Sequence, residues 1–153
     1  MELRLKQIRE KQDISQRQMA KILKISKSYY NYFESGERII TLRYLNDFCN
    51  LYHYTFDYVL GLTSINTHPK KKITIDPKLV GKRIKEIRKE NKLKQRDLAE
   101  MINTSQSTVS SYENGNTLIL TAFLYEIAVK LNVSADYLVG RSNTKKIILP
   151  KLD

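Results

Sequence analysis

Residues 95–116 read QRDLAEMINTSQSTVSSYENGN, and residues 16–37 read QRQMAKILKISKSYYNYFESGE. The two stretches lie 79 positions apart, and at this offset Arg4 to Gly61 aligns with Arg83 to Gly140 without an insertion. Both apolar and polar positions recur in the two repeats. We therefore expect the two repeats, residues 4–61 and 83–140, to share one fold.

Each quoted stretch predicts two short helices joined by a tight turn. Apolar residues recur at helical spacing in QRQMAKIL and in QRDLAEMI, which places them on one face of a helix. Ser26 and Ser105 are placed to cap the next helix, and Gly36 and Gly115 end it. Only three or four residues separate the two helices, a spacing typical of a helix-turn-helix unit.

Further helices flank this unit in each repeat. Asp76 and Pro77 predict the start of a helix that runs to Asn91, because an acidic cap followed by proline is typical of a helix N-terminus. Apolar spacing predicts a fourth helix in each repeat, and Thr55 and Ser134 are placed to cap a fifth. No alternating pattern of any length competes, so the expected fold class is all-α, with two tandem five-helix domains.

The repeats leave two basic segments outside them. We expect residues 1–63 and 77–142 to form the domains, residues 64–76 a basic linker and residues 143–153 a basic tail. Residues 64–79 and 143–153 hold five of the eleven net positive charges, which favours flexible elements that contact phosphates, with plain solvated connectors as the alternative. The runs KKKITI and KKIIL are also candidates for strands that pair within or between chains.

Composition narrows the class of protein. A hydrophobic share of 41% with 28% charged residues is that of a folded globular chain. The net charge of +11 favours a polyanionic partner. No apolar run is long enough to cross a bilayer, and the N-terminus MELRLKQIREK is charged. We therefore expect a cytoplasmic, nucleoid-associated protein with no membrane partner.

Catalytic and metal chemistry have little support in the sequence. Cys49 is the single cysteine, and with two scattered histidines it cannot assemble a zinc site, so we expect it to pack in the core. No phosphate-binding glycine loop and no Ser-His-Asp or His-Cys set is present. We expect no enzyme activity, no cofactor and no small-molecule ligand.

The quoted stretches resemble the phage-repressor family of helix-turn-helix domains, known as the Cro/CI or XRE family. The resemblance covers both repeats, about 120 of the 153 residues. It rests on Gln at the start of the second helix, Ala where two helices cross, Ser before the third helix, Glu-x-Gly at its end, and a final DYVLG or DYLVG. It implies the five-helix lambda-repressor-like fold and a sequence-specific transcriptional regulator of double-stranded DNA, expected to be a repressor.

The resemblance also implies two structural ion pairs. Arg9 with Glu34, and Arg88 with Glu113, match positions that pair beneath the recognition helix in this family. An arginine fork on a carboxylate would hold the first helix of each repeat to the third. Such a pair fixes orientation more surely than it adds stability, because desolvation offsets much of its attraction.

The DNA contacts follow from the same resemblance. In related repressors the third helix enters the major groove and the second lies across the backbone. The glutamines are expected to touch phosphate or steady a base-reading side chain, while a recognition-helix glutamine can pair with adenine and a lysine with guanine. The implied contacts are Gln95, Gln106, Ser107, Ser110 and Ser111 in the second repeat, and Gln16, Lys27, Ser28, Tyr29 and Tyr32 in the first, with Asn31 nearby.

The first repeat departs from the family pattern. Its recognition helix reads KSYYNYFE, and seven of the ten tyrosines lie in residues 1–63. Tyr30 and Phe33 have the spacing of core residues, whereas Tyr29 and Tyr32 are expected on the other side, facing DNA or a protein. Lys24 stands where many family members have a small turn residue, so we expect a slightly altered turn.

Two such repeats in one chain can imitate a dimer of single-domain repressors. Because the reading positions differ between the repeats, we expect a DNA site with unlike halves. The sequence leaves open a homodimer formed through the tail. It also leaves open an alternative function as a protein-interaction module, antitoxin-like or anti-repressor, in which one repeat binds a protein partner.

Overall fold

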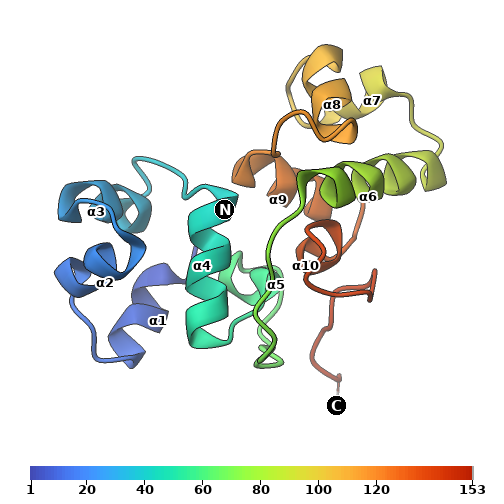
Figure 1. Ribbon diagram of the computed structural model, residues 1–153. Coiled ribbons are helices and arrows are strands. Elements are labelled where there is room, and N and C mark those ends of the chain that lie inside the picture. Colours follow the sequence, from blue (N-terminus) through green and yellow to red (C-terminus); the bar gives the residue numbers. More distant parts are fainter. Residues whose placement is uncertain (153) are drawn as a thin grey trace.

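The computed structural model describes residues 1–152 and shows a helical chain (Figure 1). Within these residues there are ten α-helices and no β-strand, with five helices in each repeat. The expected all-α class with two tandem five-helix units is confirmed.

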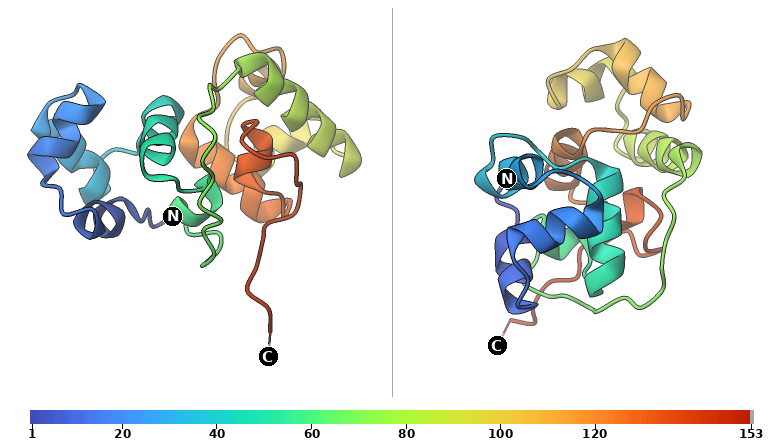
Figure 2. Two further views of the ribbon diagram at one scale, coloured as in Figure 1. Left: turned by 60° about the horizontal axis from the view of Figure 1, so that its bottom comes forward. Right: turned by 60° about the vertical axis from the view of Figure 1, so that its left-hand side comes forward.

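The helices follow the predicted order in both repeats. The first repeat contains α1 (Leu5–Lys11), α2 (Gln16–Leu23), α3 (Lys27–Ser35), α4 (Leu42–Tyr52) and α5 (Phe56–Val59). The second contains α6 (Pro77–Glu90), α7 (Gln95–Met101), α8 (Gln106–Glu113), α9 (Thr121–Lys130) and α10 (Ala135–Leu138). The α2–α3 and α7–α8 units lie at opposite ends of the molecule, and α5 and α10 meet between them (Figures 1 and 2).

Side-chain caps set the starts of these helices. Ser15 and Gln18 form a capping box at α2, with the Ser15 N–H 2.8 Å from Gln18 Oε1 and the Gln18 N–H 3.1 Å from Ser15 Oγ. Ser26 and Ser105 accept bonds from the third backbone N–H of α3 and α8. These caps satisfy N–H groups that a helix end would otherwise leave unpaired.

The turns of the two helix-turn-helix units each have a left-handed residue at the same position. Lys24 has φ 59°, and Asn103 at the equivalent position also has φ 59°. A non-glycine side chain can occupy this region at a modest cost, which the surrounding helix packing offsets. A difference between the Lys24 turn and the turns of other family members stays a prediction.

The core of each repeat is formed by the predicted apolar faces. Tyr30 and Phe33 on α3 are buried, as are Val109 and Tyr112 on α8. Cys49 is also fully buried in this core, and burial raises the pKa of its thiol. The inward placement expected for these side chains is confirmed.

The basic runs do not form strands in the part of the chain that the structure describes. Instead the amides of Asn46 and Asn50 on α4 donate to the carbonyl of Ile73 at 2.8 and 2.9 Å, and the Ile73 N–H donates to Asn50 Oδ1 at 3.1 Å. In the tail, the carbonyl of Ile148 accepts a bond from Thr63. Side chains thus take the place of a neighbouring strand, so the prediction that KKKITI and KKIIL pair as strands within the chain was wrong. Strand pairing between chains stays a prediction.

The two repeats contact each other through α5 and α10. Asp57 Oδ1 accepts the backbone N–H of Ala135 at 2.7 Å, and Asp136 Oδ1 accepts that of Phe56 at 2.9 Å. Asp57 and Asp136 are equivalent under the 79-residue offset, and so are Phe56 and Ala135. The contact is therefore reciprocal, as it is across the two-fold axis of a symmetric dimer.

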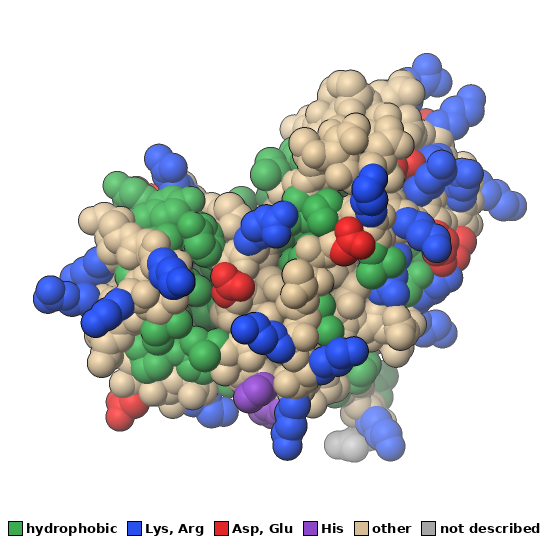
Figure 3. Space-filling view, in the orientation of Figure 1, with side chains coloured by type: hydrophobic (Ala, Val, Ile, Leu, Met, Phe, Trp, Pro, Cys, Tyr) green, Lys and Arg blue, Asp and Glu red, His purple; other side chains and the backbone are tan. Residues whose placement is uncertain are grey.

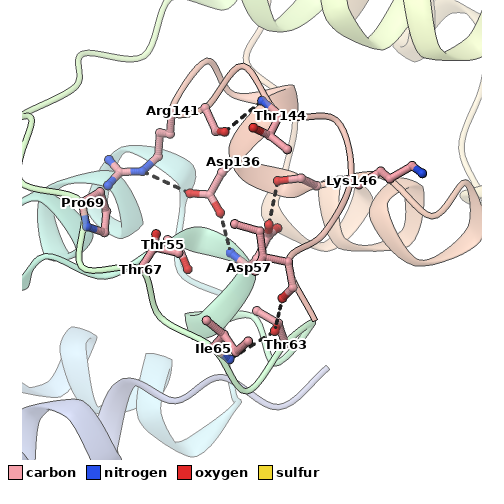
Figure 4. A pocket seen from close by; sticks show the side chains of 13 residues that line it. Thr55, Asp57, Thr63, Ile65, Thr67, Pro69, Asp136, Arg141, Thr144 and Lys146 are labelled. Atoms are coloured by element: carbon pink, nitrogen blue, oxygen red, sulfur yellow. Dashed lines mark hydrogen bonds and ion pairs between the residues drawn. The ribbon is translucent and has the colours of Figure 1, made fainter. Parts of the chain in front are cut away.

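Arg141 extends this contact to α4 and breaks its symmetry. Its guanidinium, whose side chain is 2% exposed, donates to Asn46 Oδ1 at 2.6 Å and Asn50 Oδ1 at 2.8 Å. Its Nε lies 3.5 Å from Asp136 Oδ1. Figure 4 shows Asp57, Asp136 and Arg141 gathered beside a cavity of about 140 Å³ that residues of both repeats line.

Candidate nucleic-acid interface

An ion pair lies beneath each recognition helix. Arg9 places Nε 2.6 Å from Glu34 Oε1 and Nη2 3.1 Å from Oε2. Arg88 places Nε 2.7 Å from Glu113 Oε2 and Nη2 2.9 Å from Oε1. Both arginines approach their partner as a fork, which fixes the angle between the helices as well as their separation.

The charge on Glu34 is set by its surroundings. Burial alone would favour the neutral acid, but hydrogen bonds from Arg9 and Gln16 outweigh it and hold the pKa of Glu34 below its usual value. The pKa of Arg9 is raised by the same bond. Glu34 is therefore a carboxylate at neutral pH and can only accept hydrogen bonds.

The glutamines that begin α2 and α7 bind these carboxylates. Gln16 Nε2 lies 2.9 Å from Glu34 Oε2, and Gln95 Nε2 lies 3.2 Å from Glu113 Oε1. Gln16 Nε2 also donates to Asn31 Oδ1 at 3.1 Å. Of the two roles considered for these glutamines, the geometry at Gln16 matches the steadying of a neighbouring side chain.

Four polar side chains gather on the outer side of the first helix-turn-helix unit. Lys27, Ser28 and Asn31 on α3 are exposed, and with Gln16 they line a shallow groove of about 210 Å³. Lys27 and Asn31 lie one helical turn apart and so share a face of α3. Sequence reasoning had placed Asn31 only near the contacts, because no residue pattern reveals its bond to Gln16.

The tyrosines of α3 are less exposed than the sequence indicated. Tyr29 is half-buried, with its ring 4.7 Å from that of Phe33 and 6.3 Å from that of Tyr44. Tyr32 is half-buried beneath the guanidinium of Arg38, which lies 5.6 Å from the ring centre. The outward placement of Tyr29 was only partly right, because large rings four residues apart on a helix pack together.

The second recognition helix presents uncharged polar groups. Gln106 and Ser107 are exposed, whereas Ser110 and Ser111 are half-buried. Ser107 Oγ lies 3.0 Å from Ser105 Oγ, and Ser111 Oγ lies 2.9 Å from Thr117 Oγ1. Figure 3 shows this end of the molecule as mostly uncharged polar surface, with Lys and Arg side chains around its rim.

The reciprocal contact of Asp57 and Asp136 was missed by sequence reasoning as a functional feature. The sequence showed only that both repeats carry the same residue there. An acidic residue in the first turn of the last helix, repeated in both copies, is the signal that could have found it. This contact sets how the two recognition helices are held relative to one another.

Two further features, a group of metal-binding side chains and a membrane-spanning helix, are absent from the described residues. From residue 1 to residue 152, no three His, Cys, Asp or Glu side chains are grouped so that they could hold a metal ion. No helix in that range is long and apolar enough to cross a bilayer.

Two solved structures are similar to part of the chain. One is the P22 c2 repressor in complex with synthetic operator 9T, 31% identical, covering 42% of this chain and 97% of that chain with a TM-score of 0.40. The other is SinR, described as the master regulator for biofilm formation, in complex with DNA, 33% identical, covering 39% and 95% with a TM-score of 0.37.

Curated relatives also match about one repeat. Antitoxin PezA of Streptococcus pneumoniae serotype 4 is 37% identical over 62 residues, which is 40% of this chain and 39% of that protein. The ImmF control region 10 kDa protein of Bacillus phage phi105 is 38% identical over 64 residues, 42% of this chain and 71% of that protein. The chain thus spans well under half of the antitoxin's length and most of the phage protein's.

A helix-turn-helix family, HTH_3, matches the chain twice, at residues 5–59 and 84–138. Each match falls within one of the two repeats and contains its helix-turn-helix unit. The resemblance to the Cro/CI or XRE type of domain is thereby confirmed, and the chain belongs to the HTH_3 helix-turn-helix family with two tandem copies.

Proposed function

We propose that the protein is a sequence-specific regulator of transcription, acting as a repressor, that reads the major groove of double-stranded DNA with α3 and α8. The observation that carries this proposal is the exposure of polar side chains at the starts of both helices, Lys27 and Gln106 among them. Each helix is held from behind by a buried arginine fork. Polar tips on a rigid base suit the reading of base edges.

The charge of the molecule supports a duplex as the partner. The net charge of +11 attracts phosphates and releases their counterions. Figure 3 shows Lys and Arg side chains spread over the visible face, its two outer ends included, with fewer Asp and Glu side chains among them. Phosphate contacts from such residues would position the recognition helices without reading sequence.

The two units would act together on one DNA site. The reciprocal bonds of Asp57 and Asp136 join the repeats as a two-fold axis joins the subunits of a dimeric repressor. The reading residues differ, so the proposed site has unlike halves. We propose that residues 1–63 and 77–142 each serve as one reading domain.

The pinned linker supports this arrangement over two freely tethered domains. Ile73 is bonded on both its N–H and its carbonyl to α4, while the side chains of Lys70, Lys71 and Lys72 are exposed. The backbone is thus held while three cations remain available to phosphates.

The rival function as a protein-interaction module depended on free tyrosines in α3. Tyr29 is packed against Phe33 and Tyr44, which leaves less aromatic surface for a partner.

Salt dependence tests the proposal. The affinity of the full chain for random-sequence duplex would be measured between roughly 50 and 200 mM salt. We expect a steep linear fall of log affinity with log salt, because several phosphate contacts release counterions. An affinity that does not change with salt, or no measurable binding at low salt, would contradict a function in DNA binding.

A further inference from the structure

A chain of hydrogen bonds leads from the buried ion pair of the first repeat to the surface of α3. Arg9 donates to Glu34, Gln16 donates to Glu34, and Gln16 also donates to Asn31. Asn31 is exposed at the end of this chain, beside Lys27 and Ser28. The chain thus connects a buried charge to a side chain on the proposed reading face.

The direction of every bond in the chain is fixed by its buried end. A guanidinium can only donate, and an ionised carboxylate can only accept. Glu34 must therefore face the NH₂ group of Gln16, not its carbonyl. The second hydrogen of that NH₂ group points at Asn31, which must accept it through its carbonyl oxygen Oδ1.

This ordering decides which chemical group Asn31 presents outward. Oδ1 is held at 3.1 Å by Gln16. The Nδ2 amide, which carries two N–H donors, remains for a ligand. A free asparagine can turn either group outward and pairs with adenine by using both. In Asn31 the carbonyl oxygen faces Gln16, so the NH₂ donor faces outward.

We propose that Asn31 is a specificity-determining residue that selects guanine in the half-site read by the first repeat. The proposal rests on the function in DNA binding proposed above. Guanine offers two acceptors, N7 and O6, and no donor in the major groove, whereas adenine pairs an acceptor with a donor. A side chain whose NH₂ donor is turned toward the bases therefore prefers guanine.

Lys27 strengthens the same preference. It is exposed one helical turn before Asn31 and carries only donors. Two neighbouring donors on one face of α3 favour a half-site rich in guanine on the strand they meet.

The second repeat lacks this device and serves as an internal control. Gln95 binds Glu113 as Gln16 binds Glu34, but Ser110 stands at the position equivalent to Asn31. The hydroxyl of Ser110 lies 3.4 Å from Asn114 Nδ2, an amide on its own side of the helix. A hydroxyl can both donate and accept, so no polarity is imposed there.

The test uses a duplex selected from a random library by the full chain. Each position of each half-site is replaced by the other three base pairs, and affinities are measured for the intact protein, Asn31→Ala, Asn31→Asp and Ser110→Ala. We expect one guanine in one half-site to be preferred by about five- to tenfold and to lose that preference in Asn31→Ala.

Of the other two variants, one should change the preferred base and the other should not. In Asn31→Asp one carboxylate oxygen still accepts from Gln16 and the other faces the groove, so the preference should move from guanine to cytosine, whose N4 is a donor. Ser110→Ala, in the second repeat, should leave the base preference at the Asn31-dependent position unchanged. Retained binding to the other half-site would show that the variants are folded.

Failure of this inference is separable from failure of the proposed function. No enrichment of any sequence by the intact protein would remove the function itself. Enrichment in which Asn31→Ala changes no base preference would overturn the role of Asn31 alone. A preference at the Asn31-dependent position for adenine, thymine or cytosine would overturn the donor polarity.

Discussion

Asp57 and Asp136 occupy the same position of the two repeats, and each carboxylate accepts the first backbone N–H of the other repeat's last helix, at 2.7 and 2.9 Å. Asp57 Oδ2 also accepts the hydroxyl of Ser134 at 2.6 Å, and Asp136 Oδ2 accepts the Asp57 N–H at 2.9 Å. Thr55 and Ser134 cap α5 and α10 from within each repeat, and each aspartate adds a bond to the first turn of the other repeat's last helix. These crossed bonds join the two helix-turn-helix units into one body.

Removal of one of these aspartates should loosen that body. In Asp57→Ala the backbone N–H of Ala135 and the hydroxyl of Ser134 lose their acceptor inside the contact, and a buried unsatisfied group costs about 1–3 kcal/mol. We expect an increased radius of gyration by small-angle scattering and a lower free energy of unfolding. Asp47→Ala, on the exposed side of α4, is the matched control. An Asp57→Ala protein as compact as the control would contradict the role of the contact.

The same contact should respond to pH. Burial and the neighbouring charge of Asp136 raise the pKa of Asp57 to about 7, against roughly 4 in an unfolded chain. The folded state therefore holds the proton more tightly. The stability contributed by this group is fully present below about pH 4 and is lost as the pH rises through about 7.

Chemical unfolding of the intact protein and of Asp57→Asn at several pH values checks the predicted direction of the change in stability with pH. Asparagine keeps the shape but does not titrate. The intact protein should lose more stability than Asp57→Asn between about pH 5 and pH 8. Equal losses in the two proteins would show that the Asp57 carboxyl does not titrate in this range.

Removing only one partner of the ion pair beneath α8 should greatly lower the free energy of unfolding. Arg88→Ala leaves Glu113, whose side chain is 1% exposed, without its guanidinium. Breaking such a pair costs about 3–5 kcal/mol. Urea unfolding measures this cost.

The double variant Arg88→Met/Glu113→Leu separates the orphaned charge from lost packing. Replacing both partners by apolar groups is often close to neutral, so it should be more stable than Arg88→Ala. A double variant less stable than the single one would show that the pair itself contributes the stability.

Gly81 in α6 is a position where substitution by alanine should lower the stability of the protein, although helix propensity alone predicts an increase. Glycine to alanine within a helix usually adds about 0.5–1 kcal/mol. Here a Cβ would lie 2.6 Å from the carbonyl oxygen of Glu113, where α6 crosses α8. We expect Gly81→Ala to destabilise the protein by about 1–3 kcal/mol.

Thermal unfolding compares Gly81→Ala with Lys85→Ala, an exposed position of the same helix. Lys85→Ala should leave the melting temperature nearly unchanged. A rise in melting temperature for Gly81→Ala would mean that α6 and α8 are less closely packed than the structure has them.

Helix starts and the internal repeat could be predicted from the sequence because their causes are local. Ser26 caps α3 through an N–H three residues away, and Asp76 caps α6 through one two residues away. The inward spacing of Tyr30 and Phe33 is likewise a property of one helix. Such features depend on neighbours along the chain, which a sequence displays directly.

The linker and the contact between the repeats could not be predicted, because their partners are distant in sequence. Ile73 is bonded by amides 23 and 27 residues away, and Asp57 by groups 77 and 78 residues away. The bond from Gln16 to Asn31 is hidden for the same reason. A polar residue in a loop or on a helix face gives no sign of such a partner.

Selection of bound duplexes from a random library, repeated with Lys27→Ala and with Gln106→Ala, tests the central claim most directly. The account predicts an enriched site with two unlike halves, in which Lys27→Ala abolishes base preference in one half and Gln106→Ala abolishes it in the other. No enrichment with the intact protein, or loss of the same half in both variants, would contradict it.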